Sequence, residues 1–195
     1  MNESLLFQAD RALFLAINNR LASPMGDGLM TLATIAGDVT VWAVFGSMAI
    51  ILWDTENAKR RMAAYAMALI ATGLLLIAVK EVVDRDRPFE YFKAGIDAGE
   101  IQINAPHQML VARSFPSGHT QAAFTAATFF ILYYRRHCGA LLVAALLVGF
   151  SRIYLGAHFP ADVVFGALLG AVGAWATWHG EQIFFLEKES ASEKR

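Results

Sequence analysis

Five long apolar runs, separated by short polar segments, constrain this chain more than any other feature. They cover about residues 29–53, 62–83, 117–134, 139–154 and 160–178. A bilayer core is crossed by about 20 predominantly apolar residues, and a helix satisfies its own backbone hydrogen bonds there. Only 17% of the residues are charged, against about 25% in soluble domains. We therefore predict an all-α, integral membrane bundle of about five transmembrane helices.

The segments at both ends of the bundle are more polar. Over residues 1–27, apolar residues recur at helical spacing but charged and amide side chains interrupt them, which predicts an amphipathic helix lying in the membrane interface. Residues 180–195 form a charged tail, and Glu187–Arg195 is expected to be disordered. No linker separates domains, so we expect a single domain over residues 1–195, with the transmembrane bundle at 28–179.

Polar residues also interrupt or border the apolar runs. Asp38 falls inside the first run and has two interpretations: it caps a helix that begins there, or it is a buried polar group that contacts a functional site. Pro88 ends the second run, and residues 89–115 are expected to form a polar loop. Pro160 is at a favoured first helical position and begins the last run.

Three polar clusters lie at the ends of these runs. Lys80 and Arg87 follow the second run, Pro116–Thr120 opens the third, and Ser151–Asp162 joins the fourth to the fifth. Charged groups are costly in a membrane unless they are paired or face an aqueous cavity, so such clusters indicate a functional site. The loops after the second and fourth spans return to the same face of the membrane, and the clusters can therefore converge on one phosphate.

The first two clusters suit an anion. Lys80 and Arg87 are two helical turns apart, and a phosphate there would meet an ammonium and a guanidinium; alternatively, Lys80 extends to the interface from the end of its span. Ser117 can cap a helix, and Gly118 lets a backbone amide approach an anion closely. His119 is a candidate proton donor to a leaving oxygen, or simply an interfacial histidine.

The third cluster combines a histidine, a carboxylate and a third cation, Arg152. His158 and Asp162 are four residues apart, which allows the carboxylate to hold one ring nitrogen and leave the other free to attack. The alternative is that Asp162 simply occupies the first turn of a helix, where the helix dipole favours an acid.

Together the clusters read Lys80-x6-Arg87-Pro88, Pro116-Ser117-Gly118-His119 and Ser151-Arg152-x5-His158-x3-Asp162. This pattern resembles the three-part signature of the type 2 phosphatidic acid phosphatase superfamily, and every position matches. The resemblance covers roughly the C-terminal two-thirds of the chain. The first apolar run and the segment before it fit the family only in kind.

The resemblance implies a metal-independent phosphohydrolase that needs no cofactor. His158 would attack phosphorus to give a phosphohistidine, Asp162 would fix the tautomer of His158, and His119 would protonate the leaving group. The remaining signature residues would bind the phosphate oxygens: Lys80, Arg87, Ser117, Gly118 and Arg152. No further Asp, Glu or His set suggests a metal site, and Arg85, His107, His137 and His179 are expected to be solvated or interfacial.

The expected substrate is a membrane lipid phosphate or diphosphate, with undecaprenyl diphosphate, phosphatidylglycerophosphate and phosphatidate ahead of lipid A. Two alternatives stay open: transfer of the phosphate to a second lipid, and a membrane protein that binds a phosphate headgroup without catalysis. The five apolar runs argue against the soluble haloperoxidases and acid phosphatases of the superfamily. The net charge of -1 and the scattered basic residues give no sign of a nucleic-acid partner, and the sequence leaves the oligomeric state open.

The distribution of basic residues predicts the orientation. With Lys80, Arg87 and Arg152 set aside, the face opposite the clusters carries eight Lys and Arg residues and the cluster face carries five. Cytoplasmic loops are enriched in Lys and Arg, so the clusters are expected on the extracytoplasmic side. The small size and the lack of a cleavable signal pattern suggest the inner membrane of a bacterium, with the site facing the periplasm.

Overall fold

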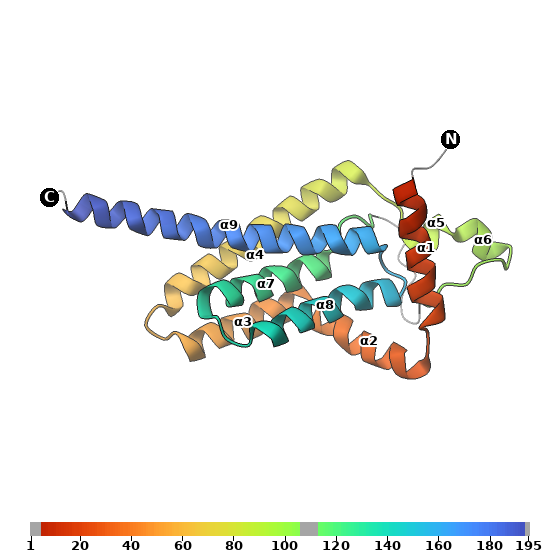
Figure 1. Cartoon of the computed structure of the whole chain (residues 1–195), viewed down its shortest axis with the longest axis horizontal. Coiled ribbons are helices and arrows are strands. Elements are labelled where there is room, and N and C mark those ends of the chain that lie inside the picture. Colours follow the sequence, from red (N-terminus) through yellow and green to blue (C-terminus); the bar gives the residue numbers. More distant parts are fainter. Residues whose placement is uncertain (1–4, 106–112, 194–195) are drawn as a thin grey trace.

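The structure is a computed structural model that describes residues 5–105 and 113–193, with side chains as far as Phe184. Within these ranges the secondary structure is helical, with no strand. The helices are α1 Leu5–Arg20, α2 Pro24–Ala36, α3 Val39–Trp53, α4 Ala58–Val83, α5 Pro88–Tyr91, α6 Lys93–Asp97, α7 Gly118–Tyr134, α8 Cys138–Tyr154 and α9 Pro160–Glu193. Figure 1 shows α3, α4, α7, α8 and α9 running lengthwise, with α1, α5 and α6 gathered at one end.

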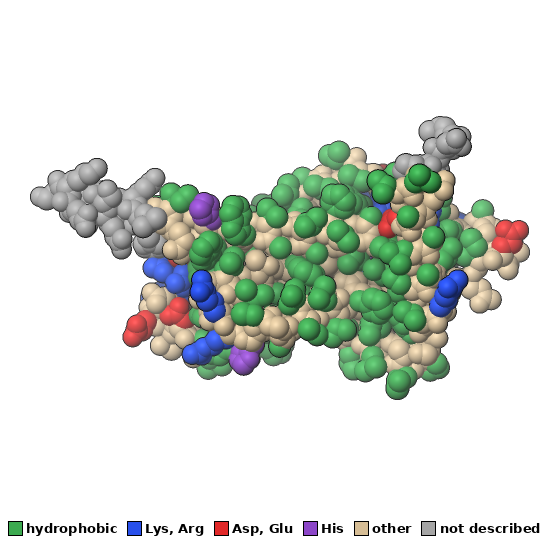
Figure 2. Space-filling model, viewed as in Figure 1, with side chains coloured by type: hydrophobic (Ala, Val, Ile, Leu, Met, Phe, Trp, Pro, Cys, Tyr) green, Lys and Arg blue, Asp and Glu red, His purple; other side chains and the backbone are tan. Residues whose placement is uncertain are grey.

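The helical bundle has the surface of a membrane protein. Apolar side chains cover the middle of the visible face, whereas charged side chains gather toward its two ends (Figure 2). By length and composition, two helical segments can each cross a bilayer, Ala58–Asp97 and Pro160–Phe184, and the pair α2 and α3 meets the same criterion together. Helices α7 and α8 are shorter, with 17 residues each. The predicted all-α membrane bundle is confirmed.

The first predicted span, residues 29–53, is a bent pair of helices. Helix α2 ends at Ala36, α3 begins at Val39, and their axes differ by 62°. Asp38 is the N-cap of α3, and its Oδ1 accepts a hydrogen bond from the amide of Thr40 at 2.7 Å. The side chain therefore satisfies an amide that the bend would leave without a partner, as the capping interpretation predicts.

Two other expectations for irregular structure were wrong. The segment 89–115 contains the short helices α5 and α6, and its residues 106–112 lie outside the described range. Helix α9 continues to Glu193, although Glu187–Arg195 was expected to be disordered. Extending an existing helix orders one residue for each hydrogen bond gained, and this tail consists largely of helix-forming residues. Residues 194–195 are outside the described range.

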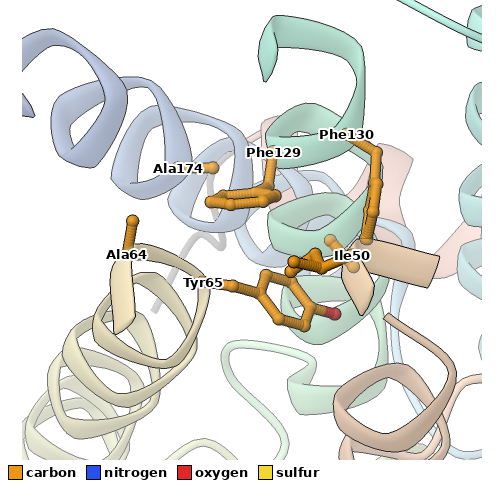
Figure 3. Packing of buried hydrophobic residues seen from close by; sticks show 7 residues of the cluster. Ile50, Ala64, Tyr65, Phe129, Phe130 and Ala174 are labelled. Carbon is orange, nitrogen blue, oxygen red and sulfur yellow. The ribbon is translucent and has the colours of Figure 1, made fainter. Parts of the chain in front are cut away.

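An aromatic core joins α3, α4, α7 and α9 (Figure 3). Tyr65 is buried against Phe129, with ring centroids 4.9 Å apart, and its hydroxyl donates to the carbonyl oxygen of Trp42 at 2.8 Å. Such a bond satisfies the polar end of a buried tyrosine. Tyr65 lies early in α4 and Lys80 near its end, so the core and the polar clusters occupy different ends of the bundle.

Glycines in α9 allow it to approach α7 closely. A Cβ atom on Gly170 would lie 2.3 Å from the carbonyl oxygen of Gln121 and 2.9 Å from the amide nitrogen of Thr125, both in α7. A Cβ on Gly166 would lie 2.5 Å from the carbonyl oxygen of Ser117. Small residues of this kind let helix backbones meet in membranes. The contact at Gly166 fixes the start of α7, where the second polar cluster begins.

We expect Gly170→Ala to destabilise the bundle, because the new methyl group meets backbone atoms of α7 that cannot move independently. Overpacking of this kind costs about 1–3 kcal/mol. The matched control is Gly73→Ala in α4, where no heavy atom lies within 4 Å of the new Cβ. Thermal unfolding of the two variants in detergent should show a lowered midpoint for Gly170→Ala alone. Equal midpoints would mean that α7 and α9 are not held this closely.

Candidate active site

The three polar clusters converge on one pocket of about 650 Å³. It lies at the end of the bundle where α4 ends, α7 begins, and α2 bends into α3. Six of the eight predicted site residues line it: Lys80, Arg87, Gly118, His119, Arg152 and His158. The lining is completed by Thr34, Ile35, Asp38, Val41, Leu155 and Ala157. Asp38 thus caps α3 and also borders the site, but it is not the buried group that the second interpretation assumed.

His158 lies in the turn between α8 and α9, and its two ring nitrogens have different surroundings. Nδ1 faces Asp162, with Oδ2 of the carboxylate 3.5 Å away. Nε2 is on the pocket side, 3.3 Å from Nη1 of Arg87. A proton on Nδ1 satisfies the carboxylate and leaves the lone pair of Nε2 directed toward the guanidinium. The arrangement therefore favours the tautomer that a nucleophilic imidazole requires.

Burial also keeps the imidazole of His158 neutral. The side chain is 2% exposed, and this burial lowers the pKa of His158 to about 3, despite the opposing effect of Asp162. Two cations, Arg87 and Arg152, act in the same direction as burial. The proton-free form of Nε2 is consequently maintained near neutral pH, where a histidine exposed to water would be partly charged.

Asp162 lies behind His158 and does not line the pocket. The carboxylate is fully buried, and its Oδ2 accepts hydrogen bonds from the hydroxyl of Ser114 and, at 2.9 Å, from the amide of Phe159. Its Oδ1 accepts from Nη1 of Arg85 at 2.7 Å. These contacts fix the plane of the carboxylate relative to the imidazole ring, as an orienting group requires.

Three cations line the same pocket as His158. Arg87 donates to the carbonyl oxygen of Ala157 at 3.0 Å, and Lys80 donates to the carbonyl oxygen of Arg113 at 2.7 Å. Arg152, at the end of α8, donates to the hydroxyl of Thr34 in α2. Within the described residues, neither Lys80 nor Arg152 forms an ion pair with a carboxylate. Their charges therefore remain available to a phosphate in the pocket.

The start of α7 presents Gly118 and His119 to the pocket, whereas Ser117 is buried beneath it. Ser117 is the N-cap residue, but its hydroxyl bonds to Oγ1 of Thr120 at 2.9 Å and makes no hydrogen bond to a cap amide. Its own amide donates to the carbonyl oxygen of Asp162 at 3.0 Å, which ties the second cluster to the third. A Cβ on Gly37 would lie 3.2 Å from the ring of His119, so this glycine lets the α2–α3 bend approach the site.

Sequence reasoning missed part of the site. Arg85 was expected to be solvated or interfacial, but it is mostly buried and bonds to Asp162. The segment from Asp84 to Arg87 alternates acids and arginines, and nothing in the pattern separates Arg85 from a solvated arginine. Thr34 and Ser114 had no motif to mark them. His137 and His179 are exposed and do not line the pocket, and His107 is outside the described residues.

The described residues contain no group of three or more His, Cys, Asp or Glu side chains that could hold a metal ion. The pocket instead presents two imidazoles and three cationic side chains, with Asp38 as its one acidic lining residue. This set of groups suits an oxyanion, whereas a hard divalent cation is held by several carboxylate or carbonyl oxygens.

Several proteins with similar sequences are named as phosphatases of membrane lipids. The chain is 29% identical over 177 residues to an undecaprenyl-diphosphatase of Sulfolobus acidocaldarius, with coverage of 88% of this chain and 76% of that protein. It is 36% identical over 109 residues to a lipid A 1-phosphatase of Rhizobium johnstonii, with coverage of 55% and 41%. For curated relatives from Escherichia coli and Bacillus licheniformis, the match spans 66% of their length.

The fold has a similar solved counterpart. The crystal structure of Aquifex aeolicus LpxE superposes with a TM-score of 0.71 at 29% identity, covering 86% of this chain and 93% of that one. The model of the PAP2 superfamily matches residues 61–185, a segment that contains all three polar clusters and excludes α1, α2 and α3. By this match, and with its signature residues gathered around one pocket, the chain belongs to the PAP2 superfamily.

Proposed function

We propose that the chain is a membrane-embedded phosphohydrolase that removes phosphate from a lipid phosphate or diphosphate through a phosphohistidine. The observation that carries this proposal is the position of Nε2 of His158. It faces a pocket lined by Lys80, Arg87 and Arg152, at the end of an apolar bundle. A phosphate bound by these cations would place its phosphorus next to an unprotonated ring nitrogen.

In the proposed first step, Nε2 of His158 attacks phosphorus and the bond from phosphorus to the lipid oxygen breaks. His119 donates its proton to the departing oxygen, and Asp162 stabilises the positive charge that develops on the ring of His158. Lys80, Arg87 and Arg152, with the amide of Gly118, hold the non-bridging oxygens. Phosphoryl transfer depends mainly on such positioning and charge stabilisation.

In the second step, water attacks the phosphohistidine and the phosphorus–nitrogen bond breaks. His119, now neutral, takes the proton from the water, and inorganic phosphate leaves. The three cations supply the positive charge that Mg²⁺ supplies in many phosphotransferases, so we propose that the reaction requires no metal ion.

The substrate that we propose first is undecaprenyl diphosphate, with phosphatidylglycerophosphate and phosphatidate next and lipid A as the alternative. The names of the relatives support undecaprenyl diphosphate and lipid A. The chain would act as a single domain, at the extracytoplasmic side of a bacterial inner membrane. The positive-inside tendency supports this orientation, because Arg60 and Arg61 at the start of α4, and Arg135 and Arg136 between α7 and α8, lie at the end of the bundle opposite the pocket.

The N-terminal helix fits the membrane interface in this proposal. One side of α1 is buried at Phe14 and Asn18, whereas Leu5, Leu6 and Leu13 are exposed. Figure 1 shows α1 crossing the end of the bundle at a steep angle to the long helices. A helix in this orientation would lie along the bilayer surface, with its exposed apolar side chains in the boundary layer of the lipids.

The test is phosphate release by the full chain in detergent, with EDTA present, from undecaprenyl diphosphate, phosphatidylglycerophosphate, phosphatidate and lipid A. We expect release from one lipid class and no loss of rate with EDTA. Transfer of phosphate to a second lipid, without net release, would support a phosphotransferase. Binding of every lipid with neither release nor transfer would overturn the enzymatic proposal in favour of a headgroup-binding protein.

A further inference from the structure

The side of Asp162 that faces away from His158 is held by an arginine outside the three-part signature. Nη1 of Arg85 lies 2.7 Å from Oδ1 of Asp162, and the Arg85 side chain is 16% exposed. Its guanidinium carbon lies 4.3 Å from the ring centroid of Phe159, the residue that follows His158. A cation over an aromatic ring is attracted by the electrons of the ring. Arg85 is thereby fixed against the turn that carries His158.

The backbone of Arg85 supports the same carboxylate. Its carbonyl oxygen accepts a hydrogen bond from the amide of Ser114 at 2.7 Å, and the hydroxyl of Ser114 donates to Oδ2 of Asp162. The Arg85 side chain therefore donates to Oδ1 of Asp162 directly. Its backbone carbonyl positions Ser114, whose hydroxyl donates to Oδ2. A fully buried carboxylate requires such partners, because an unpaired buried charge is strongly destabilising.

The second terminal nitrogen of the Arg85 guanidinium contacts the N-terminal helix α1. Nη2 of Arg85 lies 2.7 Å from Oδ2 of Asp10 in α1, and the Asp10 side chain is 9% exposed. Oδ1 of Asp10 accepts a hydrogen bond at 2.8 Å from the amide of Ala161, in the first turn of α9. Asp10 therefore bonds both to the arginine behind Asp162 and to the helix that carries Asp162.

Helix α1 is also docked by contacts that do not involve Asp10. The side-chain amide of Asn18 is buried and donates to the carbonyl oxygens of Tyr154 at 2.7 Å and Asn104 at 2.9 Å. The ring of Phe14 is fully buried, with its centroid 5.3 Å from that of Phe159. A change at Asp10 should therefore alter the charge network and leave the helix in place.

We propose that Arg85 is a positioning residue for the Asp162–His158 pair and that Asp10 holds Arg85 in position. Helix α1, which carries Asp10, therefore contributes to the geometry of the active site. The role in turnover rests on the proposed phosphohydrolase function. Arg85 keeps the carboxylate charged and oriented, so that Oδ2 faces Nδ1 of His158 and the lone pair stays on Nε2. The family match begins at residue 61, so the contribution of Asp10 comes from outside the segment that the family model matches.

The kinetic test compares Arg85→Ala, Arg85→Lys, Asp10→Asn and the Arg85→Ala/Asp10→Asn double variant. Removing a residue that orients a functional histidine typically lowers activity about 10–100-fold. We therefore expect Arg85→Ala to lower kcat about 100-fold and Asp10→Asn to lower it about 10-fold. KM should stay near the wild-type value, because Lys80, Arg87 and Arg152 still bind the phosphate. Arg85→Lys should recover part of kcat, since an ammonium keeps the charge but cannot span both carboxylates.

The double variant separates positioning from a general loss of stability. If Asp10 acts through Arg85, Asp10→Asn should cost little further activity once Arg85 is alanine, whereas independent effects would multiply. The matched acid-to-amide control is Asp97→Asn on α6, an exposed position outside the network, where kcat should be unchanged. Multiplying effects, or a KM that rises while kcat stays constant, would overturn the proposal.

A second measurement does not depend on turnover. Histidine-labelled protein in detergent micelles reports the tautomer of His158 by NMR, with the signal assigned by its loss in His158→Ala. We expect the Nδ1–H form in the wild type and a mixture of tautomers in Arg85→Ala and, less strongly, in Asp10→Asn. If Arg85→Ala does not fold, the tautomer of His158 is measured in Arg85→Lys and Asp10→Asn instead. An unchanged tautomer would refute the positioning role, whereas a changed tautomer in a protein without phosphatase activity would refute only the proposed function.

Discussion

The His158→Ala variant is expected to lose phosphate release by about 10⁶-fold in kcat, the order of loss seen when a protease loses its nucleophile. In the proposed reaction the only covalent intermediate forms on Nε2 of His158, whose other ring nitrogen faces the buried carboxylate of Asp162. With radiolabelled substrate and an alkaline quench, which preserves phosphohistidine, the wild type should show a labelled protein band and the variant none.

Two control measurements test whether the loss of activity is specific to the imidazole of His158. His179→Ala removes an exposed imidazole outside the pocket and should leave the rate unchanged. Inorganic phosphate should still protect His158→Ala against thermal unfolding, because the three cations remain and a ligand that binds the folded state stabilises it. Phosphate release at an appreciable rate by a folded His158→Ala protein would show that another group, or water, attacks the phosphorus directly.

The sequence predicts the convergence of the site well, for a reason of topology. Two consecutive spans separate the loop that carries Arg87 from the turn that carries His158, so both must return to one face of the membrane. Short-range spacing then places His158 beside Asp162. The two helical turns expected between Lys80 and Arg87 are not formed, because α4 ends at Val83, yet both side chains line the pocket.

The residues that sequence reasoning missed are those whose roles depend on packing. Arg85 is two positions from Arg87 and carries the same charge, yet it points behind Asp162 while Arg87 lies beside His158. Thr34 reaches Arg152 only because α2 and α3 bend at Gly37 and Asp38, and a continuous span would have carried it elsewhere. Contacts of α1 with the site involve residues about 75 to 150 positions apart, and periodicity contains no information about them.

Arg87→Ala is expected to reduce kcat about 10³-fold, the lower end of the range for removing an arginine that stabilises a phosphoryl transition state. Nη1 of Arg87 lies 3.3 Å from Nε2 of His158, the attacking atom, whereas Lys80 bonds to the carbonyl oxygen of Arg113 and Arg152 bonds to the hydroxyl of Thr34. The orientation of the Arg87 guanidinium is also fixed by its hydrogen bond to the carbonyl oxygen of Ala157, the residue that precedes His158. The loss should fall on kcat more than on KM, because Lys80 and Arg152 still attract the ground-state phosphate.

Comparison with Arg87→Lys separates charge from geometry. A lysine restores the positive charge but cannot hold a backbone carbonyl and two phosphate oxygens in one plane, so its kcat should lie between those of the wild type and the alanine variant. Arg136→Ala, an exposed position at the far end of the bundle, should behave as the wild type. A kcat within tenfold of wild type for folded Arg87→Ala would mean that Lys80 and Arg152 carry the transition-state charge alone. The attack of His158 would then be aligned by Asp162 without an arginine on the other side of the ring.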